Sequence, residues 1–366
     1  MFTPVYIKHG RILIRHAEKL LRYRKDFLSE TTIFELKTQV KELQKGMRLR
    51  DEKAVKAGSE RLHSLYMQYT PSPKEAAWRE NVEVILVAVV VAVGIRSYFL
   101  QPFKIPTGSM QPTLNGIIGH PMPPTQPTPN IFRQIGEFIA LGRNYINVVS
   151  AEDDEVNQIV AKKFAFFFTF SRIVCDRQDF LVYAPPDTLR QDFKVLPGNR
   201  YSKGETIAKG AIDTGDQVFV DKFTYNFVKP HRGDVFVFRT DNIPGVPVDP
   251  ETGAHNFYIK RLCGLPQDTL RIDPPRLYVN GSVAEGFGFR RVMAAKGDYR
   301  GYAPGRDYLP DPTKTYTVPP RHFFAMGDNS YNSYDSRWWG PVPEENLVGR
   351  GLLVYWPFNR HWGLIR

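Results

Sequence analysis

One long apolar run restricts the topology of this chain more than any other feature. Residues 84–95 contain no charged side chain, and extension to 82–100 gives 19 residues that include only Glu83 and Arg96 as charges. In a helix, nineteen residues at about 1.5 Å each span roughly 28 Å, close to a hydrocarbon core of about 30 Å. Both charges lie near an end of the run, where long side chains reach water. With Ser72 and Pro73 as start signals, we predict a transmembrane helix over 73–100; a buried strand or core helix is the alternative.

Basic residues are concentrated before this run. The chain carries 49 Lys and Arg against 38 Asp and Glu, a net charge of +11, and residues 1–80 hold 17 basic and 10 acidic residues. A basic chain suits nucleic acid or an anionic membrane, but the uneven distribution argues against a nucleic-acid partner. Because positive residues mark the cytoplasmic side of a span, we expect residues 1–72 in the cytoplasm and 101–366 outside it. About 80 mostly polar residues precede the run, which excludes a cleavable signal peptide.

The first 72 residues predict helices without visible chemistry. Thr32 and Glu35 have the spacing of a capping box, and apolar residues follow at alternating +3 and +4 steps: Ile33, Leu36, Val40, Leu43 and Met47. The repeat lasts only about two heptads, so we favour a short helical hairpin over a self-association stripe.

Beyond the run, the sequence predicts a mainly β fold. Short alternating segments are separated by Gly, Pro and Asp, and Asn280–Gly281 after one of them is a strong hairpin signal. The strand-like segments are 217–221, 234–239, 257–262 and 276–281. Residues 115–211 differ in character and are predicted to form an inserted lobe of unknown role. This insertion starts with a proline-rich stretch at 121–129 and has strand-like segments at 145–150, 164–175 and 180–183.

Cysteine and histidine usage points away from metals and cofactors. Two cysteines, Cys175 and Cys263, cannot form a disulfide framework or a zinc ribbon. A single disulfide between them remains open, and two free thiols are favoured. The eight histidines lack metal-ligand spacing, and no phosphate-binding glycine motif is present. We expect neither a metal nor an organic cofactor.

Two residues are candidates for catalytic chemistry. Ser109 lies in a proline-bracketed turn just after the apolar run, although serines in turns are commonly caps. Lys260 shares a strand face with Tyr258 and Leu262, whose bulk disfavours the ammonium form and prepares the amine as a general base. The alternative is a surface lysine that extends to water. The dense polar segment 326–340 fits either a shell around an active site or a polar turn.

Five segments, in this order, resemble the sequence boxes of type I signal peptidases, which are membrane-anchored serine proteases with a Ser–Lys dyad. They read PTGSMQPTL, GDQVFVDKFTY, HRGDVFVF, YIKRLCGLPQD and MGDNSYNSYDSRWWGPVPEENLVGR. The resemblance implies a β-rich, signal-peptidase-like catalytic domain. Together with the residue patterns above, it gives the expected architecture: a mainly β catalytic domain with an inserted lobe, preceded by a single transmembrane helix and an α-helical N-terminal segment. Three departures are the insertion at 115–211, Ser330 where the family usually has arginine, and Gln267 where glycine is usual.

The resemblance also implies roles for individual residues. Ser109 matches the nucleophile and Lys260 the general base, while the main-chain N–H of Ser109 and the hydroxyl of Thr107 match the oxyanion donors. Ser333 matches the hydroxyl that orients the lysine. Asp335 and Arg337 match a supporting buried ion pair, with Asp328 nearby. The walls of the substrate-binding pockets match Ile105, Pro106, Met110, Leu114, Tyr258 and Ile259.

The implied function is that of signal peptidase I, a membrane-bound serine endopeptidase that removes N-terminal signal peptides from exported preproteins. The implied partners are signal peptides, the lipid bilayer and a nearby secretion translocon, with the chain crossing the cytoplasmic (inner) membrane once. Two alternatives remain. A self-cleaving Ser–Lys repressor would need no span and would carry a helix-turn-helix near its start. A catalytically inactive, membrane-tethered peptide-binding module would not need an intact dyad.

Overall fold

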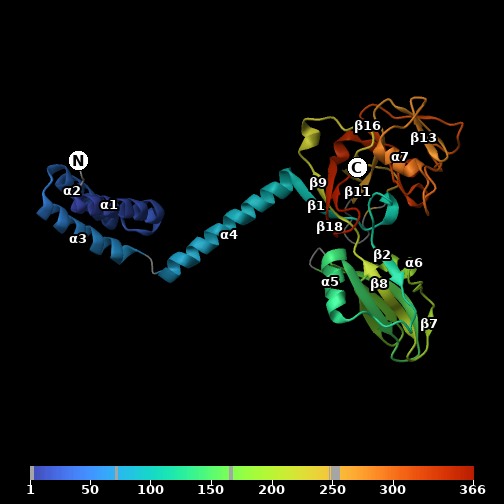
Figure 1. The fold of residues 1–366 in the computed structure, drawn as a ribbon, viewed down its shortest axis with the longest axis horizontal. Helices are drawn as coiled ribbons and strands as arrows, with labels where there is room; N and C mark the ends of the chain where they lie inside the picture. Colours follow the sequence, from blue (N-terminus) through green and yellow to red (C-terminus); the bar gives the residue numbers. More distant parts are fainter. Residues whose placement is uncertain (1–3, 71–72, 165–167, 247, 249–255) are drawn as a thin grey trace. The chain divides into compact units, whose positions relative to one another are not determined.

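The structure, a computed structural model, describes residues 4–70, 73–164, 168–246, 248 and 256–366. The chain divides into two compact units, residues 1–91 and 92–366, and each is considered by itself (Figure 1). The mainly β class predicted for the part after the apolar run is confirmed, because nineteen strands lie between Leu100 and Leu364 in the described residues.

Within the N-terminal unit, the residues before the apolar run form three packed helices rather than the predicted hairpin of two. They are α1 (Val5–Arg24), α2 (Glu30–Leu49) and α3 (Glu52–Tyr69). Their buried side chains include Ala17, Leu36, Leu43, Val55 and Leu62. The cap of α2 was predicted wrongly: Ser29, not Thr32, caps the helix, because the Ser29 Oγ accepts a hydrogen bond from the Thr32 main-chain N–H at 3.2 Å.

The apolar run forms the helix α4 (Pro73–Tyr98). Its segment Glu80–Tyr98 has 19 residues with a mean hydropathy of 1.8, and none of that segment is buried against the protein. By length and composition it could cross a bilayer. The helix begins at the predicted Pro73, while Ser72 lies outside the described residues. Leu100, predicted as the last residue of the span, is instead the first residue of a strand.

The larger unit is built on an antiparallel sheet. In spatial order its strands are β1 (Leu100–Lys104), β9 (Gln217–Asp221), β18 (Leu347–Trp356), β10 (Val235–Arg239), β11 (Phe257–Gly264), β16 (His322–Met326) and β17 (Val342–Pro343), and β19 (Gly363–Leu364) pairs with β18. Along β10, Val235 and Val237 belong to one hydrophobic cluster and Phe236 and Phe238 to another, as expected for alternate faces of a strand; the β9 valines Val218 and Val220 join the first cluster.

A smaller sheet follows in the same unit. Its spatial order is β14 (Ser282–Val283), β13 (Arg276–Val279), β12 (Thr269–Asp273) and β15 (Tyr316–Thr317), accompanied by α7 (Phe287–Met293). The predicted hairpin turn is present, because Asn280 and Gly281 have φ values of 52° and 84° and Val279 pairs with Ser282. Two consecutive positive φ angles are the requirement of a tight type I′ turn.

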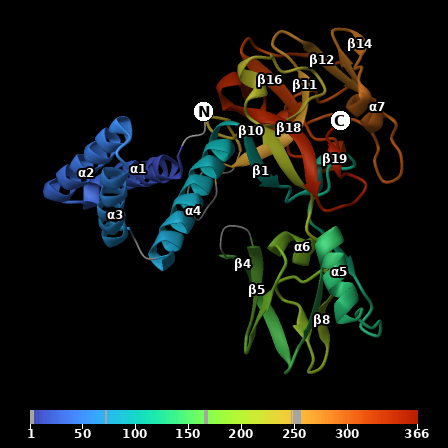
Figure 2. The same ribbon diagram turned by 60° about the vertical axis from the view of Figure 1, so that its left-hand side comes forward.

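The insertion forms a lobe with two sheets, seen below the main sheet in Figure 2. One sheet joins β2 (Ile118–Pro121), β8 (Thr206–Asp213) and β3 (Arg143–Val149); the other joins β6 (Asp179–Val182), β5 (Phe168–Cys175), β4 (Asp154–Phe164) and β7 (Arg200–Tyr201). Helices α5 (Ile131–Leu141) and α6 (Pro186–Gln191) complete the lobe. Strand β4 and helix α5 were not among the predicted segments, and β8 continues to Asp213, two residues beyond the predicted end of the insertion.

Candidate active site

Ser109 and Lys260 lie in direct contact. Ser109 belongs to the short 3₁₀ helix η2 (Gly108–Met110), which follows β1, and Lys260 lies in β11. The Lys260 Nζ is 2.6 Å from the Ser109 Oγ, although 151 residues separate them in sequence. The two side chains are 5% and 9% exposed. This hydroxyl and this amine are therefore within proton-transfer distance and largely shielded from water.

Burial determines the charge state of Lys260. Removal from water disfavours the ammonium form, and this desolvation lowers the pKa of Lys260 to about 8 despite the opposing effect of the Asp335 carboxylate. Leu262, on the same strand face, is fully buried, and the Tyr258 ring centroid is 5.9 Å from the Nζ. The apolar surroundings predicted from the strand pattern are thus present. An amine with a pKa near 8 can act as a general base in mildly alkaline solution.

The segment after β16 holds the Ser109 turn in position. The Asn329 main-chain N–H donates to the Ser109 carbonyl oxygen at 3.0 Å, and its Nδ2 donates to the Gly108 carbonyl oxygen at 3.2 Å. Gly327 lies between the Ser109 turn and the Ser333 side chain. A Cβ at residue 327 would be 2.2 Å from the Ser333 Oγ and 2.5 Å from the Ser109 carbonyl oxygen. Only a glycine allows this approach without a shift of the backbone.

A buried ion pair supports this segment from behind. The Arg337 Nη2 is 2.7 Å from an Asp335 carboxylate oxygen, and both side chains are buried. Arg337 also donates to the Ala303 and Ser330 carbonyl oxygens, each at 2.7 Å, and the second Asp335 contact is to the Gly327 N–H at 2.9 Å. Every polar atom of the pair is therefore satisfied inside the protein, which a buried charge requires.

Arg261, which the sequence analysis did not select, forms a second buried ion pair. Its guanidinium contacts the Asp328 carboxylate through two nitrogens at 2.6 and 2.7 Å, with both side chains 0% exposed. Asp328 also accepts from the Thr113 hydroxyl. Alternation along β11 puts Arg261 on the face opposite Lys260. Its burial could not be recognised in the sequence, because an arginine next to a strand lysine usually indicates a solvent-facing residue.

The other predicted residues vary in their relation to the pair. The Thr107 hydroxyl is 3.4 Å from the Ser109 Oγ. The Ser333 Oγ is buried and has no hydrogen-bond partner within the described part of the chain, so it does not bond the lysine in this structure. Of the predicted pocket residues, Tyr258 and Ile259 are half-buried and Pro106 is exposed, whereas the other three pack in the core: Ile105, Met110 and Leu114.

Two departures from the resembled pattern have structural explanations. Ser330 accepts hydrogen bonds at its Oγ from the Ala303 N–H at 2.9 Å and from Arg337 at 2.7 Å, so it belongs to the buried network. Gln267 has a φ of 69°, in the left-handed region that favours glycine. The usual glycine is thus explained by the backbone, and glutamine tolerates the position at some conformational cost.

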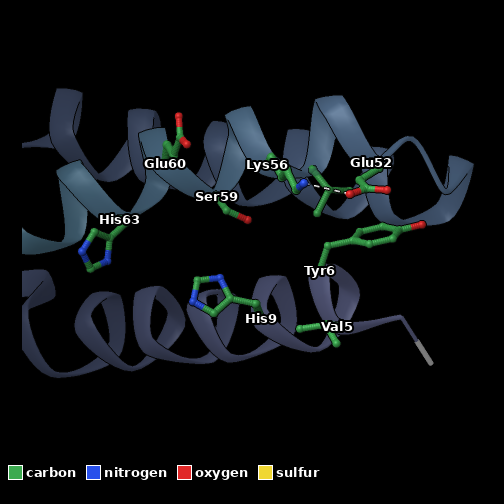
Figure 3. A pocket seen from close by; sticks show the side chains of 9 residues that line it. Val5, Tyr6, His9, Glu52, Lys56, Ser59, Glu60 and His63 are labelled. Carbon is green, nitrogen blue, oxygen red and sulfur yellow. Dashed lines mark ion pairs between the residues drawn. The ribbon is translucent and has the colours of Figure 1, made fainter. Parts of the chain in front are cut away.

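The sequence predicts neither a metal site nor a disulfide framework, and the cavity found in the N-terminal unit does not include the Ser109–Lys260 pair. In the described residues, no group of three His, Cys, Asp or Glu side chains could hold a metal ion. Cys175 and Cys263 are both buried free thiols, as favoured above. A cavity of about 590 Å³ between α1 and α3 contains His9 and His63 on facing helices and an exposed Lys56–Glu52 ion pair at 2.8 Å (Figure 3). It contains no nucleophile paired with a base.

Comparison with known proteins agrees with this geometry. A family profile described as "Signal peptidase, peptidase S26" matches residues 78–118 and 201–356, which leaves out most of the inserted lobe. A signal peptidase I of Leptolyngbya laminosa is 34% identical over 162 residues, covering 44% of this chain and 70% of the relative. A signal peptidase I of Pseudomonas aeruginosa is 33% identical over 49% of this chain and 69% of its own length. A Bacillus subtilis relative, signal peptidase I V, is 35% identical over 37% and 72% respectively.

Proposed function

Because the chain belongs to the signal peptidase family, peptidase S26, we propose that it cleaves signal peptides with Ser109 as the nucleophile and Lys260 as the general base. The serine peptidase activity and the signal-peptide substrates follow from the family. The assignment of the two residues rests above all on one observation, the 2.6 Å contact between the Lys260 Nζ and the Ser109 Oγ in a buried position. A serine needs an adjacent base to become nucleophilic.

The proposed reaction proceeds in two halves. Neutral Lys260 takes the Ser109 proton while the Oγ attacks the scissile carbonyl carbon, and the main-chain N–H of Ser109 with the Thr107 hydroxyl stabilises the oxyanion. One such donor is worth about 2.7–4 kcal/mol in the transition state. The Lys260 ammonium then protonates the leaving amine as the acyl-enzyme forms. Water hydrolyses the ester, again with Lys260 as the base, and the proton returns to Ser109.

The position of β1 suits an extended substrate. β1 lies at one edge of the main sheet, pairs only with β9 among the described strands, and leads directly into the turn that carries Ser109. An edge strand presents unpaired main-chain groups to which a peptide can add as a further strand. We propose that the signal-peptide end binds there, with its small side chains directed towards Tyr258 and Ile259.

Membrane attachment and orientation belong to the same proposal. The helix α4 has the length and hydropathy of a span, and the basic excess before it favours a cytoplasmic N-terminus. We propose that residues 1–72 lie in the cytoplasm, that α4 crosses the inner membrane, and that the remainder lies outside, near the translocon that delivers preproteins.

The assignment of Ser109 as the nucleophile is tested by incubating a preprotein with the detergent-solubilised protein and measuring its cleavage. Ser109→Ala should leave the preprotein uncut, whereas Ser282→Ala, at an exposed serine in β14, should cleave as the wild type does. N-terminal sequencing of the product should identify one cut after a small residue. Cleavage by Ser109→Ala at the wild-type rate would refute the assignment.

A further inference from the structure

The helix α5 of the inserted lobe is oriented with its apolar face towards solvent. It spans Ile131–Leu141, and none of its described residues is buried. At 100° per residue, its apolar side chains fall on one stripe; these exposed residues are Ile131, Phe132, Ile135, Phe138 and Ile139. Figure 2 shows the helix on the outside of the lobe.

On the opposite side of α5, the polar residues Gln134 and Glu137 are half-buried instead. The Glu137 carboxylate accepts a hydrogen bond from the Tyr145 hydroxyl on β3 at 2.5 Å. It also forms an ion pair with Arg133 at 2.8 Å. Gln134 donates to the Pro129 carbonyl oxygen at 2.7 Å. A surface helix of a soluble domain normally packs its apolar stripe on the core. The hydrogen bond to Tyr145 fixes this orientation, which leaves the apolar stripe facing solvent and favours an apolar partner there.

The exposed stripe continues onto the segment that follows β18. The Trp356 Nε1 donates to the Ile139 carbonyl oxygen at 2.7 Å, and the Phe358 N–H donates to the Ala140 carbonyl oxygen at 2.8 Å. Beyond these contacts Phe358 and Trp362 are themselves exposed, with ring centroids 6.1 Å apart. Large contiguous apolar surfaces are rare on soluble proteins and mark contact sites.

Positive charge accompanies this surface. Trp362 also lines a cavity of about 320 Å³ that contains three arginines and no Asp or Glu side chain: Arg291, Arg360 and Arg366. Burial is the main cause of a lowered pKa of Arg291, and the neighbouring Arg261 and Arg360 lower it further against the opposing Asp328 carboxylate. Aromatic and aliphatic side chains beside arginines are the composition of surfaces that bind anionic lipid.

The register of the sheet places this surface close to the expected span. Strand β1 starts at Leu100, two residues after the end of α4, and ends at Lys104. Lys104 pairs with Gln217 of β9, and Gln217 pairs on its other side with Trp356 of β18. Five strand residues cover only about 17 Å. If α4 crosses a bilayer as proposed above, the chain leaves that bilayer at residues 98–100, a short strand away from this apolar patch.

We propose that the apolar face of α5, together with Phe358 and Trp362, inserts into the headgroup zone of an anionic lipid bilayer. The inserted lobe thereby supplies a second membrane attachment, independent of α4 and of catalysis. The arginine-lined cavity next to Trp362 receives lipid phosphate.

A fluorescent probe in the full chain tests this surface. Phe132→Cys, at a residue 83% exposed, and the control Leu181→Cys, at a residue 62% exposed on β6 of the same lobe, are labelled with an environment-sensitive dye. The unsubstituted chain, whose two cysteines are buried, gives the background. Each protein is reconstituted in phosphatidylcholine vesicles with and without phosphatidylglycerol, and quenching by lipid-linked nitroxide is compared with quenching by aqueous iodide.

The dye at position 132 should be quenched several-fold more by nitroxide than the dye at 181 and should be protected from iodide, most strongly with phosphatidylglycerol. Arg360→Gln in the Phe132→Cys chain should reduce the phosphatidylglycerol effect. Equal iodide quenching at both positions would overturn the proposal. So would a dye at 132 that is shielded from iodide but insensitive to lipid nitroxide, because a second protein copy would then cover α5.

Discussion

Arg261 and Asp328 form a fully buried ion pair on the opposite face of β11 from Lys260, which precedes Arg261 in sequence. The two charged atoms are 2.6 Å apart, and Asp328 lies just before Asn329, which holds the Ser109 turn. Two adjacent residues of one strand thus perform different tasks: Lys260 contacts the serine, and Arg261 anchors the segment that positions that serine. The pair connects the stability of the unit to the geometry of the proposed dyad.

Loss of one partner of this pair should be costly. Asp328→Asn leaves the Arg261 charge buried without a counterion, and we expect the free energy of unfolding to fall by about 3–5 kcal/mol. Denaturant titration followed by tryptophan fluorescence measures this in the larger unit, which holds four of the five tryptophans. Glu155→Gln is the control, because its partner Arg200 is 83% exposed, and it should change stability by less than about 1 kcal/mol. Equal losses in the two variants would contradict this assignment.

Gly327 should be intolerant of any side chain. Alanine would place its Cβ 2.2 Å from the Ser333 Oγ and 2.5 Å from the Ser109 carbonyl oxygen, which forces the serine turn to move. A displacement of about 1 Å can cost about 100-fold in rate, and we expect Gly327→Ala to lose at least that much in kcat/KM. Gly136→Ala in α5 meets nothing within 4 Å and should retain full activity. Unchanged cleavage by Gly327→Ala would show that the turn has more freedom than the structure indicates.

Local patterns in the sequence predicted the parts of the site whose environment is local. Tyr258 and Leu262, which flank Lys260 on its strand face, correctly predicted the desolvation of that lysine. The dipeptide Asn280–Gly281 correctly predicted the hairpin turn between β13 and β14. The burial of Arg261 could not be predicted in this way, because its counterion is 67 residues away and depends on the packing of two strands. The apolar stripe of α5 has helical spacing, but the orientation of that stripe depends on Glu137 and Tyr145, which only the folded lobe brings together.

The buried lysine should destabilise the protein at neutral pH. With the pKa of Lys260 lowered from 10.5 to about 8, protonation in the folded state costs about 3 kcal/mol, at about 1.36 kcal/mol per pKa unit. Lys260→Met removes this cost and the hydrogen bond to Ser109, so we expect it to be inactive but more stable by about 2 kcal/mol at pH 7.

The pH dependence of that difference has a definite sign. Between pH 8 and 10.5 the unfolded state binds more protons at Lys260 than the folded state does, so wild-type stability rises with pH. The advantage of Lys260→Met should therefore shrink across this window, as measured by denaturant titration at each pH. Lys203→Met, at an exposed lysine, should change stability by less than about 0.5 kcal/mol. A gap that does not change with pH would mean that Lys260 keeps an ordinary pKa.

Activity should follow the neutral fraction of Lys260. Since only the free amine can accept the Ser109 proton, kcat/KM should fall about tenfold per pH unit below the pKa of about 8 and level off above it. Lys260→His should retain at most a trace of activity with this limb moved towards neutral pH, because an imidazole ordinarily has a pKa of about 6.5. If the pH dependence of kcat/KM were the same in Lys260→His as in the wild type, a group other than Lys260 would be responsible for it. Lys260→Arg should be inactive at every pH, because a guanidinium stays protonated.

The most direct measurement is single-turnover cleavage of a preprotein by full-length wild type and Lys260→Ala at pH 9, where the base is neutral. Removal of the amine that lies 2.6 Å from the Ser109 Oγ should reduce the rate to that of Ser109→Ala. If Ser109 and Lys260 act as one catalytic unit, removal of either side chain should reduce the cleavage rate to the same low value. Cleavage by Lys260→Ala at close to the wild-type rate would contradict the account, because another group would then deprotonate Ser109.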